Sequence, residues 1–408
     1  MPAPALAVAS LAPIQSAISR YKGCRCVKEY KDTTNDDRDD FDPLVFTTTY
    51  NASITIYTFR VGWKYFYADE AVEAAIAWDD PTTGAWSLLD ALDRAYTAGK
   101  GFNLLLTSGA DTPAWVKAYV PASEKDNFDV PGPRQPPCVL LPVPWSATYR
   151  TYWHAFIDLV AARVGNHPAL DAVGVSGATA NSMEPNLPHN EADACVVGAP
   201  MDATIRWIQL GYTSTKNVQA WHDDVVKFRR AFPHKHISHA LHPALGIGPN
   251  GEQAVSYKSS VRQEIIDEYM DLVPGRFALQ TSGLKGDDGG AEGYDIVGEY
   301  DGRAYTGFQF ATSCARNPTK MGDPLDPVNA AYLTIQKGLA ADAKYLEIYQ
   351  KDWLDAGVGI TSPVVGKTFL QVFADAYPAA TFPTAGAGGT TASNALGVVA
   401  KPAPPALT

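Results

Sequence analysis

Short apolar runs alternate with longer amphipathic segments along most of the chain. The runs are bounded by glycine, proline or polar residues, which predicts β-strands. They lie at 54–63, 102–107, 172–176, 236–241, 277–281, 306–311 and 345–349, with a further candidate at 44–49. Between them, apolar residues recur at the helical spacing and predict helices at 86–98, 147–164, 218–231, 260–273 and 328–341.

The order of these elements predicts the fold class. Strands that alternate with helices indicate an α/β protein whose parallel sheet is covered by helices. Eight strands, counting the one at 44–49, fit a closed (β/α)8 TIM barrel. The alternative is an open doubly wound sheet, which usually carries a glycine-rich phosphate loop after its first strand. Here the polar and aromatic KYFYADE follows the strand at 54–63, so the pattern favours the barrel.

Both ends of the chain depart from this pattern. Residues 1–45 combine an alanine-rich stretch with an acidic one and are expected to form an N-terminal arm or docking segment. The first basic side chain is Arg20, so the start does not resemble a secretory signal peptide. Residues 46–380 hold the predicted barrel, and 381–408 form a Gly/Ala/Pro-rich tail. We expect these two extensions to be the parts of the chain that dock to partner chains.

Composition narrows the function classes. The 408 residues have a formal net charge of -11, which argues against nucleic acid as a partner, because phosphate binding needs clustered Lys and Arg. Apolar stretches are too short for a membrane span. The chain contains 20 Tyr, 15 Phe and 9 Trp, and this abundance is typical of sugar-handling proteins, although large cores also use aromatics.

Cysteine and histidine patterns do not point to a cofactor. Five scattered cysteines do not resemble a disulfide framework. In the histidine-rich run 234–242, His236 and His239 differ in strand parity and should point to opposite faces. We therefore expect neither a metal ion nor an organic cofactor.

Candidate chemistry comes from residues at the ends of the predicted strands, where barrels place their active sites. Glu184 follows the strand at 172–176, and Glu347 lies within the strand at 345–349. Two carboxyl groups are what glycoside hydrolysis requires. The alternatives are a solvated loop carboxylate for Glu184 and a structural ion pair for Glu347, which should face the barrel lumen together with Tyr345 and Tyr349.

Amide, aromatic and imidazole side chains near the same strand ends are candidates for sugar binding. They are Trp63, Tyr65, Trp115, Asn181, His239, Gln280, Gln309 and Trp353.

Several segments resemble clan-A glycoside hydrolases, particularly the β-galactosidase-like group. The resemblance covers about 50–378 and rests on Trp63, the acidic segment 79–84, Trp86, the Gly99-Lys100 turn and the Thr-Pro-Ala-Trp of 112–115. The segments 141–177 and 342–353 are also similar to that group. The resemblance implies a TIM barrel with an acid/base Glu after its fourth strand, where Glu184 lies.

One departure from the family leaves the activity open. The family's nucleophile is a Glu at the end of the seventh strand, and this position holds Gln309. Either Glu347 has taken the role of second carboxylate, or Glu299 reaches the site, or the barrel binds carbohydrate without hydrolysing it. The sequence therefore predicts a glycosidase-like barrel acting on a polysaccharide or cell-surface glycan. The alternative is a non-catalytic carbohydrate-binding barrel in a larger assembly such as a bacteriophage tail. Either protein is expected to be extracellular or virion-associated.

Overall fold

The computed structural model describes most of the chain between residues 23 and 376. The exceptions within this span are 31–53, 68–87, 131–137, 181, 190–191, 194, 196–200, 243, 249–254, 288–293, 301, 350–351 and 353–358. Of residues 23–30, 65, 192–193, 201 and 255–257 only the backbone is described.

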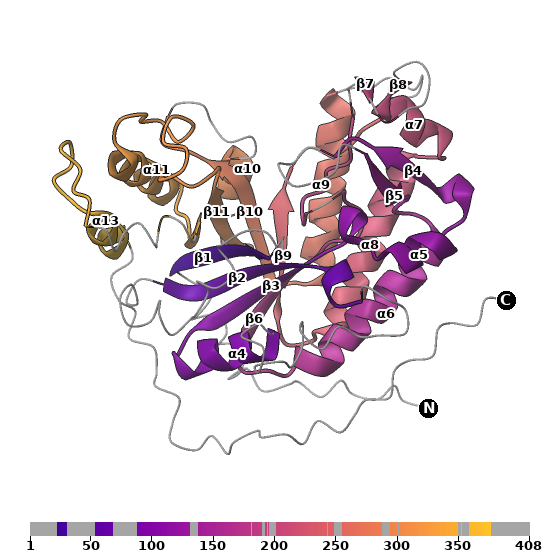
Figure 1. The fold of residues 1–408 in the computed structure, drawn as a ribbon, viewed down its shortest axis with the longest axis horizontal. Coiled ribbons are helices and arrows are strands. Elements are labelled where there is room, and N and C mark those ends of the chain that lie inside the picture. Colours follow the sequence, from indigo (N-terminus) through magenta and orange to yellow (C-terminus); the bar gives the residue numbers. More distant parts are fainter. Residues whose placement is uncertain are drawn as a thin grey trace.

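Eight parallel strands close into a barrel, which confirms the predicted TIM-barrel class (Figure 1). Their order around the barrel is β1-β12-β11-β10-β9-β6-β3-β2. The strands are β1 (Gly23–Tyr30), β2 (Ile54–Gly62), β3 (Gly101–Thr107), β6 (Leu170–Gly174), β9 (His236–Leu241), β10 (Phe277–Leu284), β11 (Tyr305–Phe310) and β12 (Tyr345–Tyr349). Seven of them match predicted strands, and the predicted strand at 44–49 lies outside the described residues.

Strand β1 corrects the predicted domain division. Residues 23–30 were expected to belong to an N-terminal arm, but they pair with β12 on one side and β2 on the other. The sequence GCRCVKEY has three charged residues and one aliphatic residue, so it lacks the apolar run that marks the other strands. The arm therefore cannot extend over 1–45 as a whole.

Alternation along each strand separates an outer core from the lumen. On β2, Tyr57, Phe59 and Val61 belong to the large core between strands and helices. Ile56, from the opposite face of β2, packs in the lumen with Ala172, Ala278 and Tyr345.

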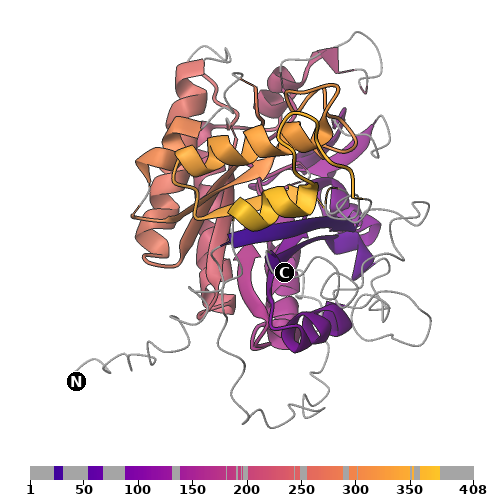
Figure 2. The same ribbon diagram turned by 90° about the vertical axis from the view of Figure 1, so that its left-hand side faces the viewer.

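Helices cover the barrel, at the predicted places except for α10 and α13, which were not predicted. They are α4 (Leu88–Thr97), α6 (Ala147–Val164), α8 (Ser214–Ala231), α9 (Val255–Leu272), α10 (Tyr294–Glu299), α11 (Pro327–Ala340) and α13 (Phe369–Ala376). Figure 2 shows α11 and α13 packed together on one flank of the barrel. No helix in the described part of the chain is long and apolar enough to span a membrane.

A small cap lies at the carboxyl end of the barrel, built from excursions after β3 and β6 (upper right in Figure 1). Its elements are α5 (Ala114–Tyr119), β4 (Lys125–Phe128), β5 (Val139–Pro142), β7 (Ala192–Asp193), β8 (Met201–Asp202) and α7 (Ala203–Gln209). A second apolar core holds the cap together, and in it Phe128 stacks on Trp207 with ring centroids 4.1 Å apart. The buried Arg206 covers the same Phe128 ring and forms an ion pair with Asp126.

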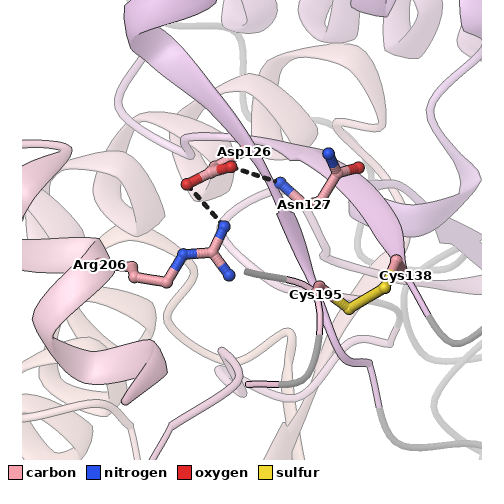
Figure 3. The surroundings of a disulfide bond; sticks show 5 residues. All are labelled: Asp126, Asn127, Cys138, Cys195 and Arg206. Carbon is pink, nitrogen blue, oxygen red and sulfur yellow. Dashed lines mark hydrogen bonds and ion pairs between the residues drawn. A yellow bond between two sulfur atoms is a disulfide. The ribbon is translucent and has the colours of Figure 1, made fainter. Parts of the chain in front are cut away.

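A disulfide between Cys138 and Cys195 links the two excursions of the cap (Figure 3). The two Cα atoms are 5.4 Å apart, within the usual range for a disulfide. The scattered cysteines did not resemble a disulfide framework in the sequence, yet these two pair. They lie 57 positions apart in the sequence, and the segment between them contains α6 and β6, so only the folded barrel brings them together.

Candidate functional site

The lumen of the barrel holds a polar network centred on Glu347 of β12. The Thr58 hydroxyl of β2 donates to Glu347 Oε2 at 2.8 Å, and the Gln309 side-chain amide of β11 donates to Oε1 at 2.6 Å. The exposed fraction of Glu347 is 0%. Both carboxylate oxygens are thus engaged by residues of neighbouring strands.

Other lumen side chains extend this network. The Asn103 amide of β3 lies 3.4 Å from the Thr58 hydroxyl, and the Tyr345 hydroxyl donates to Gln280 Oε1 at 3.1 Å. All of these side chains are buried. Buried polar groups of this kind are stabilised by satisfying one another.

The burial of this network bears on the predicted roles of three residues. A nucleophile must touch the substrate, and Glu347 presents no surface to one. Gln280 and Gln309 were expected to bind sugar, but both are buried and bonded to lumen partners. Both side chains lie in the lumen, where the structure gives them almost no exposed surface for the predicted contact with a sugar.

Glu184 lies above the lumen in the loop that follows β6. It is half-buried, and its carboxylate accepts no hydrogen bond from any residue that the structure describes. Its backbone N–H donates to the Ser182 hydroxyl at 3.0 Å, which fixes the loop. The preceding Met183 is buried in a small apolar cluster with Leu105 and Ala240, so a layer of apolar side chains lies beside Glu184 at the mouth.

Asp111 is a carboxylate of the mouth that the sequence did not single out. It follows β3 in the short helix η3 (Gly109–Asp111), and only 5% of it is exposed. Thr107 donates to Oδ2 at 2.5 Å, and Lys64 pairs with Oδ1 at 3.0 Å. The carboxylate lies against Gly62, where an added Cβ would be 2.7 Å from Asp111 Cγ. A glycine at 62 therefore lets Asp111 lie across the ends of β2 and β3.

The loops that carry Asp111 and Glu184 are joined through their backbones. Ala110 N donates to Ala180 O at 2.6 Å, Ala180 N donates to Asn186 O at 2.9 Å, and Asn186 N donates to Glu184 O at 2.7 Å. The mouth is thus one connected surface built from the segments after β2, β3 and β6.

Two predicted sugar-binding residues belong to the core. Trp63 is 1% exposed and packs against Trp153 and Phe156 of α6. His239 faces the helices, between Trp221 of α8 and Tyr269 of α9, and burial lowers its pKa to about 3. Their predicted role in binding is wrong, because each side chain points away from the lumen. The predicted opposite directions of His236 and His239 are confirmed, since His236 contacts Tyr305 instead.

Trp115 lies at the rim of the mouth, as part of an aromatic group on the surface. This group, which we call the α5 platform, consists of Tyr67, Trp115, Tyr119 and Tyr152. Tyr119 stacks on Tyr152 with ring centroids 5.6 Å apart, and Trp115 meets Tyr152 edge-on at 5.4 Å. Trp115 is half-buried and Tyr119 is 41% exposed, so the platform presents aromatic surface to solvent.

Four candidate residues remain: three lie outside the described parts of the structure, and one lies away from the mouth. The Tyr65 side chain, Asn181 and Trp353 lie outside the described residues. Glu299 is exposed at the end of α10, just before β11 begins, and so lies near the amino end of the barrel. It cannot supply a second carboxylate at the mouth.

Comparisons with known proteins find similarity among solved structures only. No protein-family model and no curated protein sequence matches the chain. Among solved structures it is similar to a β-galactosidase from the psychrophilic Marinomonas ef1, with a TM-score of 0.45 and 12% identity over 80% of this chain and 54% of that one. It is also similar to an endo-1,4-β-mannanase from Rhizomucor miehei, with a TM-score of 0.47 and 9% identity over 81% of this chain and 85% of that one.

The chain is likewise similar to the old yellow enzyme homologue from Zymomonas mobilis, with a TM-score of 0.46 and 12% identity over 80% of this chain and 84% of that one. The chain spans about half the length of the β-galactosidase. The strand order itself shows the barrel fold that the predicted resemblance to clan-A glycoside hydrolases implied. Because one barrel hosts many chemistries, an activity must be argued from the site.

Proposed function

We propose that this protein binds a glycan at the carboxyl end of its barrel and does not hydrolyse it. The observation that carries the proposal is the α5 platform, where Trp115 and Tyr119 present aromatic surface beside the mouth. Flat apolar faces with a polar edge suit the alternating C–H and hydroxyl surfaces of a pyranose ring. The rings are held in place by Tyr67 and Tyr152, so little side-chain freedom is lost on binding.

The lumen carboxylate argues for binding over hydrolysis. Hydrolysis of a glycosidic bond needs two carboxyl groups on either side of that bond. Glu347 is enclosed by Thr58 and Gln309, and Glu299 is at the other end of the barrel. Gln309 stands where the related enzymes have their nucleophile, and here its amide serves as a donor to Glu347.

Hydrolysis remains the second candidate because of one observation. The Glu184 carboxylate lies in the loop after the fourth barrel strand, where the clan-A resemblance expects the acid, and no described residue bonds to it. A role as acid would require a second carboxylate about 5–9.5 Å away. Substitution of Glu184 by glutamine should leave binding intact if the protein only binds.

The location outside the cell or on a virion stays a proposal. The Cys138–Cys195 disulfide supports it, because disulfides persist mainly in oxidising compartments. Fractionation of the producing cells tests it: the protein should be found in the medium or in released particles, and recovery only from the cytosol would contradict it.

The binding proposal is tested by co-sedimentation with insoluble polysaccharides such as cellulose, chitin, xylan and mannan. For a polysaccharide that retains the wild type, Tyr119→Ala combined with Trp115→Leu should lower affinity about tenfold or more, since each stacked ring contributes roughly 1 kcal/mol. Tyr96→Ala is the matched control, because Tyr96 is 38% exposed but lies on α4 near the amino end of the barrel. Equal affinity of the platform variant and the control would contradict the proposal.

A further inference from the structure

Lys117 is a cation at the mouth, and no carboxylate in the described part of the chain bonds to it directly. It lies on α5 between Trp115 and Tyr119, half-buried, and its ammonium donates to the Ala110 carbonyl at 3.3 Å. This acceptor is neutral and the bond is long, so at least two of the three N–H groups have no acceptor among the described residues.

The neighbouring carboxylate is already occupied. Asp111 uses Oδ1 for Lys64 and Oδ2 for Thr107. Lys117 is close enough to be affected by both charges: burial and the nearby Lys64 together lower its pKa to about 8, against the opposing effect of Asp111. Lys117 is therefore a cation that has lost solvent without gaining an ion pair.

A second ammonium group lies nearby. Lys125 donates to the Lys117 carbonyl, again a neutral backbone acceptor. The segments after β2 and β3 thus bring Lys64 and Lys117 close to Asp111, and the Lys125 ammonium close to the α5 backbone, within a protein whose net charge is -11. A local group of cations on an acidic protein indicates selection of an anion.

We infer that Lys117 binds an anionic group, a carboxylate or a sulfate ester, carried by an acidic glycan that also contacts the α5 platform. This inference rests on the proposed function, since it names the class of glycan. Lys117 alternates with Trp115 and Tyr119 along the six-residue helix α5, so its side chain leaves the other side of that helix, and a sugar chain must pass over α5 to meet both chemistries. The anion supplies the acceptors that the Lys117 ammonium lacks.

The inference predicts a pH dependence of binding. An anion favours the charged ammonium, so binding should weaken as the pH rises above about 8 and free Lys117 loses its proton. The charged groups that act on Lys117 are Lys64 and Asp111, and Lys125 bonds to its backbone. The protonation of Lys117 changes near pH 8.

The first test needs no glycan and uses inorganic sulfate with the full chain. The rate at which acetic anhydride acetylates Lys117 is followed by mass spectrometry between pH 7 and 10. Sulfate should shift the pH midpoint of Lys117 acetylation to a higher value and leave the pH midpoint of Lys216 acetylation unchanged. Lys216 is a matched control, because its ammonium also bonds a backbone carbonyl but lies exposed on α8. An unchanged Lys117 midpoint overturns the anion site, and equal shifts at both lysines indicate general screening, which also overturns it.

The second test determines whether the bound anionic group is a carboxylate or a sulfate ester. Oligogalacturonate is compared with its methyl ester, which has the same rings without the charge, and sulfated carrageenan oligosaccharides with their desulfated forms. Wild type should bind one charged form about tenfold more tightly than its neutral partner, the value of one charge-assisted hydrogen bond. Lys117→Gln should abolish this preference, whereas Lys216→Gln should keep it. Equal binding of charged and neutral forms overturns the inference.

The two tests separate this inference from the proposed function. If the platform variant loses every glycan but sulfate still shifts Lys117, both the platform and the anion site are supported. If no glycan binds while sulfate shifts Lys117, the proposed function fails and the anion site stands. If glycans bind through the platform without regard to charge, the proposed function stands and this inference fails.

Discussion

At the scale of single residues, Glu347 illustrates how burial changes the meaning of a carboxylate. A charged group inside a barrel is tolerated when its hydrogen bonds are satisfied. Thr58 and Gln309 both donate to Glu347, so the carboxylate is matched to two donors from neighbouring strands. We interpret Glu347 as part of the structure of the lumen, where it links β12 to β2 and β11.

Glu347→Gln should therefore act on stability. An amide at 347 has one acceptor oxygen, so at least one donor of the network would face another donor. Leaving a buried polar group unpaired costs about 1–3 kcal/mol, and urea unfolding should show this loss. Glu184→Gln is the control, because its carboxylate has no bond to lose among the described residues, and its effect should stay within about 0.5 kcal/mol. Full stability of Glu347→Gln would contradict the structural role.

The direction of several side chains was predictable from the sequence, but their access was not. The alternation of side chains along a strand correctly predicted that Glu347 faces the lumen. It also correctly predicted that His236 and His239 point to opposite faces. The same reasoning could not tell that Trp63, just past the end of β2, packs against α6. Asp111 was missed because its importance depends on contacts with Lys64 and Thr107, which the chain order does not reveal.

At the scale of elements, the loop after β6 depends on one glycine. Gly177 has a φ of +147°, and its carbonyl accepts hydrogen bonds from Tyr149 and Ser108 at 3.2 and 3.4 Å. An added Cβ would be 2.0 Å from Asp224 Oδ2. Asp224 is itself buried and bonded to His154 at 2.8 Å, so it cannot move away freely. The loop that carries Glu184 thus begins with a close approach to α6 and α8.

Gly177→Ala should destabilise the protein by more than about 3 kcal/mol, because backbone strain and a clash with a buried carboxylate add together. Gly275→Ala is the matched control: its φ is +72° and an added Cβ would meet nothing within 4 Å. Gly275→Ala should lower the free energy of unfolding by about 1–2 kcal/mol, because it introduces backbone strain without a clash. Equal midpoints of the two variants in urea unfolding would show that the clash is relieved and that the loop is less constrained than we infer.

Elements with a strong periodic signal were predicted from the sequence, and elements without one were not. Helix α6 has the predicted bounds of 147–164, and seven strands fall where apolar runs occur. Strand β1 was not predicted because its charged residues interrupt the apolar pattern that marks a strand. In the structure it is recognised by its pairing with β12 and β2. The short elements of the cap are too brief to produce a periodic pattern.

At the scale of the whole molecule, the barrel and the cap have separate cores. The cap core joins the excursions after β3 and β6, and the disulfide links the same two excursions covalently (Figure 3). Cys138 is exposed and Cys195 half-buried, so the bond is open to reductants. Its pairing could not be predicted, since connectivity depends on a fold that brings together residues 57 positions apart.

Removing this disulfide should loosen the cap before the barrel. For a closed loop of this length, the chain-entropy model gives a loss of about 4 kcal/mol. In Cys138→Ser combined with Cys195→Ser, hydrogen exchange should quicken in β4, β5 and α7 and stay slow in β2, β3 and β10. Equal acceleration in cap and barrel would show that the two unfold as one unit, contrary to the separate cores.

The central claim is that the barrel binds a glycan without cleaving it. The most direct measurement is the chain length of a retained polysaccharide after prolonged incubation with excess wild-type protein, determined by size-exclusion chromatography and by reducing-end assay. We predict that the polysaccharide is recovered bound and at its original length. Shortened chains, with Glu184→Gln unable to produce them, would contradict the claim and show that this barrel is a hydrolase.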